Sequence, residues 1–292
     1  MNISGRTKVC ALIGKPVDHS LSPCIQNTAF QYLGLDYVYV AFEVEPKDLE
    51  DLILGVRSLK IHGLNVTMPL KEKILRRLDL LDDNAKRIGA VNTIINKQGK
   101  LIGYNTDGEG ALRALEANSQ EPKNKKIVIL GAGGASRALC YELVEEAREI
   151  VILNRTQQRA AALAEELSNI FDNKTRYDRL ERSILEIELE NADLLINATS
   201  LGMYPHEDKS PIDQDLLRSD LPIFDLVYNP IETRLLYEAR SIGAPTIGGL
   251  NMLVHQGASS FEIWTEKKAP VNIMMNAAHV ELQRLIRKKS DQ

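Results

Sequence analysis

The stretch Lys126-Ile-Val-Ile-Leu-Gly-Ala-Gly-Gly-Ala-Ser136 decides the fold of this chain of 292 residues. The apolar run Ile127–Leu130 predicts a buried strand, and the glycines after it predict a tight turn into a helix. Gly131 permits the bend, and Gly133 lets the backbone approach a pyrophosphate, which the first amides of the helix can bind. Ser136 stands where a third glycine is usual and is small enough to keep helix and strand close. The stretch predicts a dinucleotide-binding unit, although a turn without a ligand would share the pattern.

The next apolar run, Ile150–Leu153, ends in Asn154-Arg155-Thr156, with Arg159 soon after. An aspartate or glutamate here would bind the ribose 2′-hydroxyl of NAD, whereas an arginine accommodates the 2′-phosphate of NADP. The missing acid and the arginines favour NADP, because a guanidinium pairs with phosphate and a carboxylate would repel it. The alternative is that both arginines are ordinary surface residues.

Composition restricts the class of protein. The length exceeds one average domain, and 44% hydrophobic residues suffice for two cores. A net charge of −4 gives no broad basic surface for nucleic acid or anionic lipid, so a small-molecule substrate is favoured. The three cysteines and five histidines show no metal-ligand spacing, which predicts no metal. No signal peptide or run of about 20 apolar residues occurs, so we expect a soluble cytoplasmic protein.

The first third of the chain alternates expected strands with expected helices. The strands are Val9–Ile13, Tyr37–Phe42 and Gly63–Thr67, and the helices cover residues 22–33 and 46–58. This alternation predicts parallel βαβ units, so an α/β fold precedes the dinucleotide turn.

The second part has the strand pattern of a Rossmann-type, doubly wound domain. Strands are expected at residues 127–130, 150–153, 194–196, 223–226 and 246–247, each followed by a Gly, Asn or Pro cluster. Ligands bind at the carboxyl ends of such strands. We therefore expect an NADP-binding domain at residues 109–248. The last helix is expected to return to the first domain, which would then be a discontinuous substrate-binding domain of residues 1–108 and 249–292.

Polar segments of the first domain are candidates for the chemistry, because hydride transfer requires an acid/base group and donors that orient the substrate. Ser20 and Ser22 could present two hydroxyls to a carboxylate at a helix start, or Ser22 could simply cap that helix. Lys71 is expected just inside a helix with a solvated charged face, residues 71–77. A lysine and Asp107 converging on one hydroxyl would form an acid/base pair; an ordinary interdomain ion pair is the alternative.

Nine spaced blocks, in order over nearly the whole chain, are similar to one family. They are Ser20-Leu-Ser-Pro23, Asn65-Val-Thr67 with Pro69 and Lys71, Gly89-Ala-Val-Asn-Thr93, Gly103-Tyr-Asn-Thr-Asp107, Gly131-Ala-Gly-Gly-Ala135, Asn154-Arg-Thr156, Asn197-Ala-Thr-Ser-Leu-Gly-Met203, Asp225-Leu-Val-Tyr-Asn-Pro230 and Met252-Leu-Val-His-Gln-Gly257. Together they resemble the shikimate dehydrogenase family.

The resemblance implies an oxidoreductase that interconverts 3-dehydroshikimate and shikimate with NADP, in the shikimate pathway to chorismate and aromatic amino acids. It makes Lys71 the acid/base group and Asp107 its partner. The implied substrate-binding residues are Ser20, Ser22, Asn65, Thr67, Lys71, Asn92, Asp107, Tyr228 and Gln256. The implied cofactor-binding residues are Gly131, Ala132, Gly133, Gly134, Ala135, Asn154, Arg155, Thr156, Arg159, Thr199, Met203 and Gly249. For Met203, simple core packing is the alternative.

The sequence departs from the family pattern at two positions, and two rival functions stay open. Gln26 replaces a histidine more usual in the family and cannot titrate near neutrality. Asn251 replaces a usual glycine, which predicts either a left-handed residue or a different hinge. The rivals are a quinate or dual quinate/shikimate dehydrogenase that uses NAD(P), and a non-catalytic sensor of the same ligands. The sequence does not decide between a monomer and a homodimer.

Overall fold

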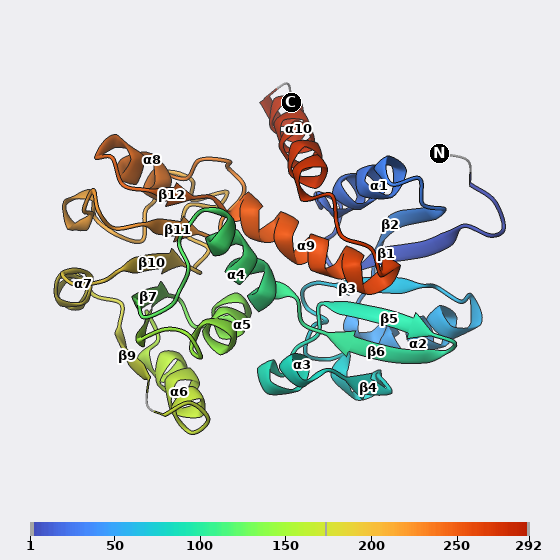
Figure 1. Ribbon diagram of the computed structural model, residues 1–292, viewed down its shortest axis with the longest axis horizontal. Helices are drawn as coiled ribbons and strands as arrows, with labels where there is room; N and C mark the ends of the chain where they lie inside the picture. The colour runs from blue at the N-terminus through green and yellow to red at the C-terminus, as the bar shows by residue number, and fades with distance from the viewer. Residues whose placement is uncertain (1–2, 173, 291–292) are drawn as a thin grey trace. The chain divides into compact units, whose positions relative to one another are not determined.

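The computed structural model describes residues 3–172 and 174–290 of an α/β protein (Figure 1). The chain divides into two compact units. Unit 1 comprises Met1–Thr106 and Val254–Gln292, and unit 2 comprises Asp107–Leu253. The sequence predicts these limits at residues 108/109 and 248/249.

The sheet of unit 1 is mixed. Its strands, in the order β2-β1-β3-β5-β6-β4, are β2 Tyr37–Glu43, β1 Lys8–Gly14, β3 Gly63–Val66, β5 Thr93–Lys97, β6 Lys100–Tyr104 and β4 Leu80–Leu81. The first three are parallel, as expected, but β5 runs antiparallel to both β3 and β6. The expectation of parallel βαβ units therefore holds for the three strands that the sequence predicted, and the antiparallel β5–β6 hairpin was not predicted. The turn between β5 and β6 contains Gln98 and Gly99, both with positive φ, which suits a tight hairpin.

Helices cover this sheet, and two predictions about them are wrong. They are α1 Ser22–Tyr32, η1 Pro46–Asp48, α2 Leu49–Ser58, η2 Leu75–Arg77, α3 Asp83–Ile88, the later part of α9 Gly249–Thr265, and α10 Val271–Ser290. Ser22 is the first helical residue, and Leu21 holds the cap position without a side-chain bond, so the expected serine cap is wrong. Residues 71–74 form turns before the short η2, so the expected charged helix is also wrong.

The two ends of unit 1 meet in the core. Helix α10 packs against α1 (Figure 1). Trp264 of α9 lies over Gly63, where an added Cβ would come within 2.3 Å of the indole Nε1. That nitrogen donates to the carbonyl oxygen of Ile94 at 2.9 Å. A glycine is needed at the start of β3 for this contact, which joins the C-terminal helices to the sheet.

Unit 2 contains a parallel sheet with the doubly wound order. Its strands, in the order β12-β11-β10-β7-β8-β9, are β12 Thr246–Ile247, β11 Ile223–Asp225, β10 Leu194–Asn197, β7 Lys126–Leu130, β8 Glu149–Asn154 and β9 Thr175–Arg179. The helices are α4 Asp107–Ala117, α5 Gly134–Leu143, α6 Gln157–Ser168, α7 Arg182–Leu189, η3 Gln214–Leu216 and α8 Arg234–Ser241. The direction of winding reverses between β7 and β10, where such sheets bind ligands. Strand β9 was not expected, because this edge strand reads Thr-Arg-Tyr-Asp-Arg and lacks an apolar run.

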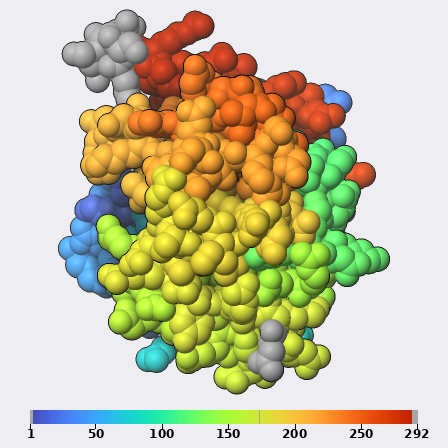
Figure 2. Space-filling model, turned by 90° about the vertical axis from the view of Figure 1, so that its left-hand side faces the viewer, coloured from blue at the N-terminus to red at the C-terminus, as the bar shows by residue number. Residues whose placement is uncertain are grey.

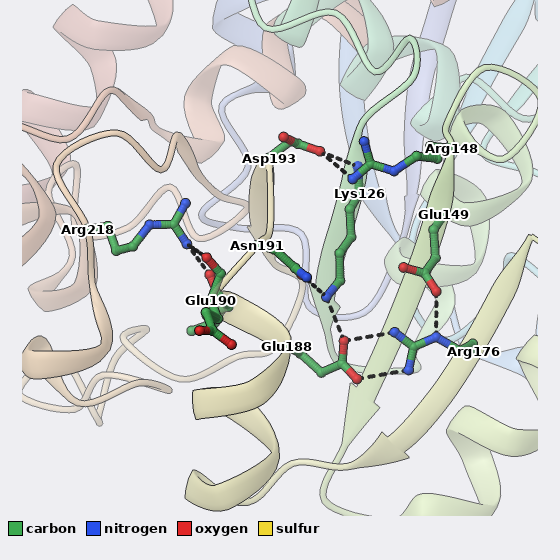
Figure 3. A network of polar contacts seen from close by, with 10 residues as sticks. Lys126, Arg148, Glu149, Arg176, Glu188, Glu190, Asn191, Asp193 and Arg218 are labelled. Atoms are coloured by element: carbon green, nitrogen blue, oxygen red, sulfur yellow. Dashed lines mark hydrogen bonds and ion pairs between the residues drawn. The ribbon is translucent and has the colours of Figure 1, made fainter.

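Ion pairs between charged side chains link the amino ends of these strands to helix α7 (Figure 3). The Lys126 ammonium, at the start of β7, lies 2.8 Å from the Glu188 carboxylate of α7, and both side chains are buried. Arg176 of β9 forks onto the same carboxylate with two bonds of 2.9 Å. These ion pairs lie at the end of the sheet opposite the Gly131 turn. In Figure 2, the middle segments of unit 2 form the surface coloured yellow.

Candidate active site

In unit 1, the ends of β1 and β3 approach unusually closely. The Thr67 amide donates to the Ile13 carbonyl oxygen at 2.9 Å. An added Cβ on Gly14 would lie 2.3 Å from the Thr67 methyl carbon and 2.7 Å from the Met68 carbonyl oxygen. Only glycine fits there, so the backbone of β1 fixes the position of Thr67 beyond the carboxyl end of β3.

Asn65 of β3 is the centre of a buried polar cluster. Its Nδ2 lies 3.1 Å from the Asn92 carbonyl oxygen, 3.1 Å from the Thr93 hydroxyl and 3.0 Å from the Ser260 hydroxyl. Its Oδ1 accepts a bond of 2.8 Å from the Tyr39 hydroxyl. The amide has two hydrogens for three acceptors. A further acceptor at Nδ2 would therefore have to share or replace one of these bonds, whereas Oδ1 has a second lone pair for a donor.

Asn92 extends this cluster to the C-terminal helix α9. Its Oδ1 accepts from the Thr106 amide at 2.9 Å, and its Nδ2 lies 3.4 Å from Gln256 Oε1. The Thr106 hydroxyl donates to the Gln256 carbonyl oxygen at 3.1 Å. The structure thus brings three predicted residues, Asn65, Asn92 and Gln256, into one cluster.

Four members of the cluster were not proposed from the sequence: Tyr39, Thr93, Thr106 and Ser260. Thr93 and Thr106 lie inside quoted motifs and directly beside named residues. Ser260 is four residues after Gln256, so the helical period places both on one face of α9. For Tyr39, the sequence contains no signal beyond its place in a strand.

Lys71 lies in the turn after β3 and is half-buried. Its carbonyl oxygen accepts from the Val91 amide at 2.9 Å, which places its backbone beside Asn92. Asp107 directly follows Thr106 and opens helix α4 as the first residue of unit 2. Because the two residues belong to different units, their pairing stays a prediction.

The start of α1 carries the two predicted serines and the glutamine departure. The Ser22 amide donates to the Ser20 hydroxyl at 3.2 Å. The buried Gln26 donates through Nε2 to the Gly257 carbonyl oxygen at 2.8 Å, directly after Gln256. Its Oε1 has no hydrogen-bond partner among the residues that the structure describes. The glutamine therefore ties α1 to α9, a role that needs no titratable group.

In unit 2, the glycine turn has the form that a pyrophosphate needs. Gly131 has a φ of +105°, and an added Cβ would lie 2.9 Å from the Ala198 carbonyl oxygen. At Gly133 and Gly134, an added Cβ would meet no atom of the described residues within 4 Å. The Ser136 hydroxyl donates to the Gly131 carbonyl oxygen at 2.7 Å and holds the turn. The start of α5 is therefore open on the Cβ side of both glycines, so no side chain there hinders an anion that approaches the first turn of the helix.

The end of β8 lies beside that turn, because β8 pairs in parallel with β7. Asn154 Nδ2 donates to the Thr156 carbonyl oxygen at 2.9 Å, which shapes the loop. Arg155 and Arg159 are exposed, and neither guanidinium has an ion-pair or hydrogen-bond partner among residues 3–172 and 174–290. Both remain available for a phosphate.

The remaining predicted residues border the ends of β10 and β11. Thr199 donates its amide and its hydroxyl to Asn197 Oδ1, at 3.0 Å and 2.7 Å. Met203 is 44% exposed, so core packing does not explain it. Tyr228 is half-buried, and this burial raises the pKa of its hydroxyl. An added Cβ on Gly249 would lie 2.2 Å from the Leu226 carbonyl oxygen, which fixes the start of α9 against β11.

The structure decides one of the two alternatives for Asn251. It lies inside α9 in helical conformation, and its side chain donates back to the Gly248 carbonyl oxygen at 3.1 Å. It is therefore not a left-handed residue.

Comparison with known proteins decides the family. Family models match residues 12–94 (shikimate dehydrogenase substrate binding domain), 113–211 (shikimate / quinate 5-dehydrogenase) and 249–279 (shikimate 5′-dehydrogenase C-terminal domain). A curated protein of Methanopyrus kandleri, shikimate dehydrogenase (NADP(+)), is 51% identical over 280 residues, which cover 95% of this chain and 97% of that protein. The chain belongs to the shikimate dehydrogenase family.

Solved structures of this shikimate dehydrogenase family have the same fold. A shikimate dehydrogenase in complex with NADP⁺ aligns with a TM-score of 0.91 at 45% identity, covering 96% of this chain and 98% of that one. Shikimate 5-dehydrogenase from Listeria monocytogenes, in complex with shikimate and NAD, aligns with a TM-score of 0.90 at 40% identity, covering 94% and 98%. These likenesses confirm the two-domain α/β fold, with an N-terminal substrate-binding domain and a Rossmann-like domain.

Among the residues that the structure describes, none of the helices combines the length and the hydropathy of a membrane-spanning segment. No group of three or more His, Cys, Asp or Glu side chains there could hold a metal ion.

Proposed function

We propose that this protein catalyses the NADP-dependent, reversible reduction of 3-dehydroshikimate to shikimate, in the pathway to chorismate and aromatic amino acids. Its curated relatives are named for this reaction. The observation that carries the choice of cofactor is the open turn at Gly133 and Gly134 beside Arg155 and Arg159, whose guanidinium groups have no partner in the part of the chain that the structure describes. A 2′-phosphate fits that pair, and NADP is the dinucleotide that has one.

The nicotinamide of bound NADPH supplies the hydride that reduces the substrate carbonyl carbon. In the proposed mechanism, the Lys71 ammonium donates a proton to the carbonyl oxygen, which becomes the new hydroxyl. Asp107 holds that ammonium and stabilises its charge. In the reverse direction, neutral Lys71 accepts the hydroxyl proton.

The polar cluster of unit 1 supports the proposed substrate site. Ser20 and Ser22 would bind the substrate carboxylate, and Tyr228 would line the pocket. Asn65, Thr67, Asn92 and Gln256 would bind the ring hydroxyls, and the buried bonds that hold them reduce the cost of ordering them during binding.

The loops of unit 2 support the proposed cofactor site. Gly131, Ala132, Gly133, Gly134 and Ala135 would surround the pyrophosphate. Asn154, Arg155, Thr156 and Arg159 would bind the adenosine 2′-phosphate, and Thr199, Met203 and Gly249 would border the nicotinamide. This assignment makes unit 2 the cofactor domain and unit 1 the substrate domain.

The test is nicotinamide absorbance of the purified protein with shikimate and quinate, each crossed with NADP⁺ and NAD⁺. We expect shikimate with NADP⁺ to give the highest kcat/KM. A lead for quinate or NAD⁺ would favour the quinate or dual-specificity alternative, which the NAD-bound relative makes worth testing. If none of the four assays shows turnover while the ligands still bind, the non-catalytic sensor would be favoured.

We further propose that the enzyme acts in the cytoplasm on a small-molecule substrate, without nucleic acid or membrane partners. A homodimer is the assembly to test against a monomer. Light scattering coupled to gel filtration separates the two by mass.

A further inference from the structure

A fully buried carboxylate lies at the carboxyl end of β11. Asp225 is 0% exposed. Its Oδ1 accepts from Asn197 Nδ2 at 2.9 Å and from the Val227 amide at 3.0 Å. Its Oδ2 accepts from the Thr233 hydroxyl at 2.6 Å. One side chain thus joins the end of β10, the loop after β11 and the cap of α8.

The carboxylate determines how Asn197 is oriented. With Nδ2 turned to Asp225, Oδ1 of the same amide accepts both the amide and the hydroxyl of Thr199. The reverse orientation would place an oxygen against a carboxylate and an NH₂ group against the Thr199 amide. Asp225 therefore fixes the position of Thr199 through one intervening residue.

The loop that begins at Ala198 is also the one that meets the glycine turn. The Ala198 amide donates to the Leu130 carbonyl oxygen at 2.8 Å, and its own carbonyl oxygen would lie 2.9 Å from a Cβ added at Gly131. On the other side, Val227 leads directly to Tyr228. The two loops held by Asp225, residues 198–203 and 227–230, both follow strands at or beside the reversal point of the sheet.

We propose that Asp225 is a positioning residue for the nicotinamide end of the cofactor. It does not touch the cofactor but holds the loop of residues 198–203, which the proposed function places at the ring, together with the loop of residues 227–230, which carries Tyr228. This inference rests on the proposed function, which places Thr199 and Met203 beside the nicotinamide. Charge-assisted bonds in a buried environment are strong enough to hold two loops, and no neutral side chain of this shape accepts all three donors.

The test is Asp225→Asn, which keeps the shape of the side chain but replaces one carboxylate oxygen by an NH₂ group. That group is a hydrogen-bond donor and would face the donors that now bind the carboxylate. We expect kcat with shikimate and NADP⁺ to fall about 10²-fold, the size of a small misplacement of reacting groups. Affinity for 2′,5′-ADP, which lacks the nicotinamide, should stay unchanged in a titration calorimeter. The fluorescence of bound NADPH, which reports the ring environment, should move toward that of free NADPH.

Asp193→Asn is the matched control. This aspartate also accepts a backbone amide, that of Lys126 at 2.7 Å, but it lies at the opposite end of the sheet. We expect its kcat and NADPH fluorescence to match those of the wild type. If both variants change equally, Asp225 has no specific role at the ring.

An unchanged kcat in Asp225→Asn would overturn the proposal. Loss of 2′,5′-ADP binding in parallel with kcat would also overturn it, since the effect would then extend to the whole cofactor site. If Asp225→Asn does not fold, Thr233→Val removes one of the three donors, and an unchanged kcat and fluorescence there would overturn the proposal. Should the wild type turn over no substrate, the proposed function fails, whereas the fluorescence comparison still tests Asp225.

Discussion

Lys71 is the residue on which the proposed chemistry depends. Its backbone is held beside Asn92, at the edge of the buried polar cluster. We expect Lys71→Ala to lower kcat at least about 10²-fold, as loss of a general acid/base does, while shikimate still binds. Steady-state kinetics and equilibrium binding of shikimate measure the two effects separately. Retained turnover would remove Lys71 from the mechanism.

Arg155 tests the choice of cofactor. Its guanidinium is exposed and free to meet a phosphate. We expect Arg155→Ala to raise KM for NADP⁺ far more than KM for NAD⁺, because only NADP⁺ has the 2′-phosphate. Equal increases would show that the arginine stacks on the adenine and does not read the phosphate.

Asp225 makes a further prediction, about stability. Burial raises the pKa of Asp225 to about 6. The hydrogen bonds from Thr233, Val227 and Asn197 lower this pKa, but their effect is smaller than that of burial. A raised carboxyl pKa means that the folded state holds the proton more tightly, so stability falls as the pH rises from the ordinary aspartate value through 6. Relative to Asp225→Asn, the wild type should lose about 3 kcal/mol of unfolding free energy over this range. Urea unfolding at pH 4 and pH 8 measures the loss, and parallel pH profiles would contradict it.

At the scale of elements, the amino end of the second sheet depends on a buried ion pair (Figure 3). Arg176 and then Lys126 lower the pKa of Glu188. A lowered carboxyl pKa stabilises the fold above the ordinary glutamate value, and this stability is lost as the pH falls through the folded value. We expect Glu188→Ala to cost about 3 kcal/mol at pH 7, because it leaves the Lys126 charge buried with only Asn191.

The control for this variant is on the same helix. Glu186 pairs with Arg182 at 3.0 Å, four residues apart, and both side chains are about half exposed. Glu186→Ala should change the unfolding free energy by less than about 0.5 kcal/mol. Equal losses for the two variants in urea unfolding would mean that the buried pair contributes nothing special.

The elements also show where prediction from the sequence stopped. Strands with apolar runs, such as β7 and β8, were expected within one residue of their ends, because burial on both faces leaves a continuous apolar run. Strand β9 was missed because Tyr177 and its charged neighbours lie at an edge, where no apolar run is required. The β5–β6 hairpin was missed although Gln98-Gly99 suits a tight turn, because the helix-alternating pattern around it suggested parallel strands.

At the scale of the molecule, the alternation of strands and helices predicted the two-domain α/β fold, and Asn154 with Arg155 predicted NADP; the comparisons confirm both. The family blocks could not predict the polar cluster as a unit. Asn65, Asn92 and Gln256 are far apart in sequence, and only the fold brings their amides together. Tyr39 and Ser260 were missed as members of the cluster for the same reason. Neither residue type indicates in the sequence that it bonds to Asn65, which is more than 20 positions away.

The division of the chain has a consequence for its synthesis on the ribosome. Unit 2 is inserted between the two parts of unit 1, so its entire sheet is synthesised before residues 254–292. Until then, Asn65 lacks the Ser260 hydroxyl, and Gly63 lacks the indole of Trp264. The nascent chain can therefore complete the inserted nucleotide-binding fold first, whereas the substrate side is assembled last, when its final two helices leave the exit tunnel.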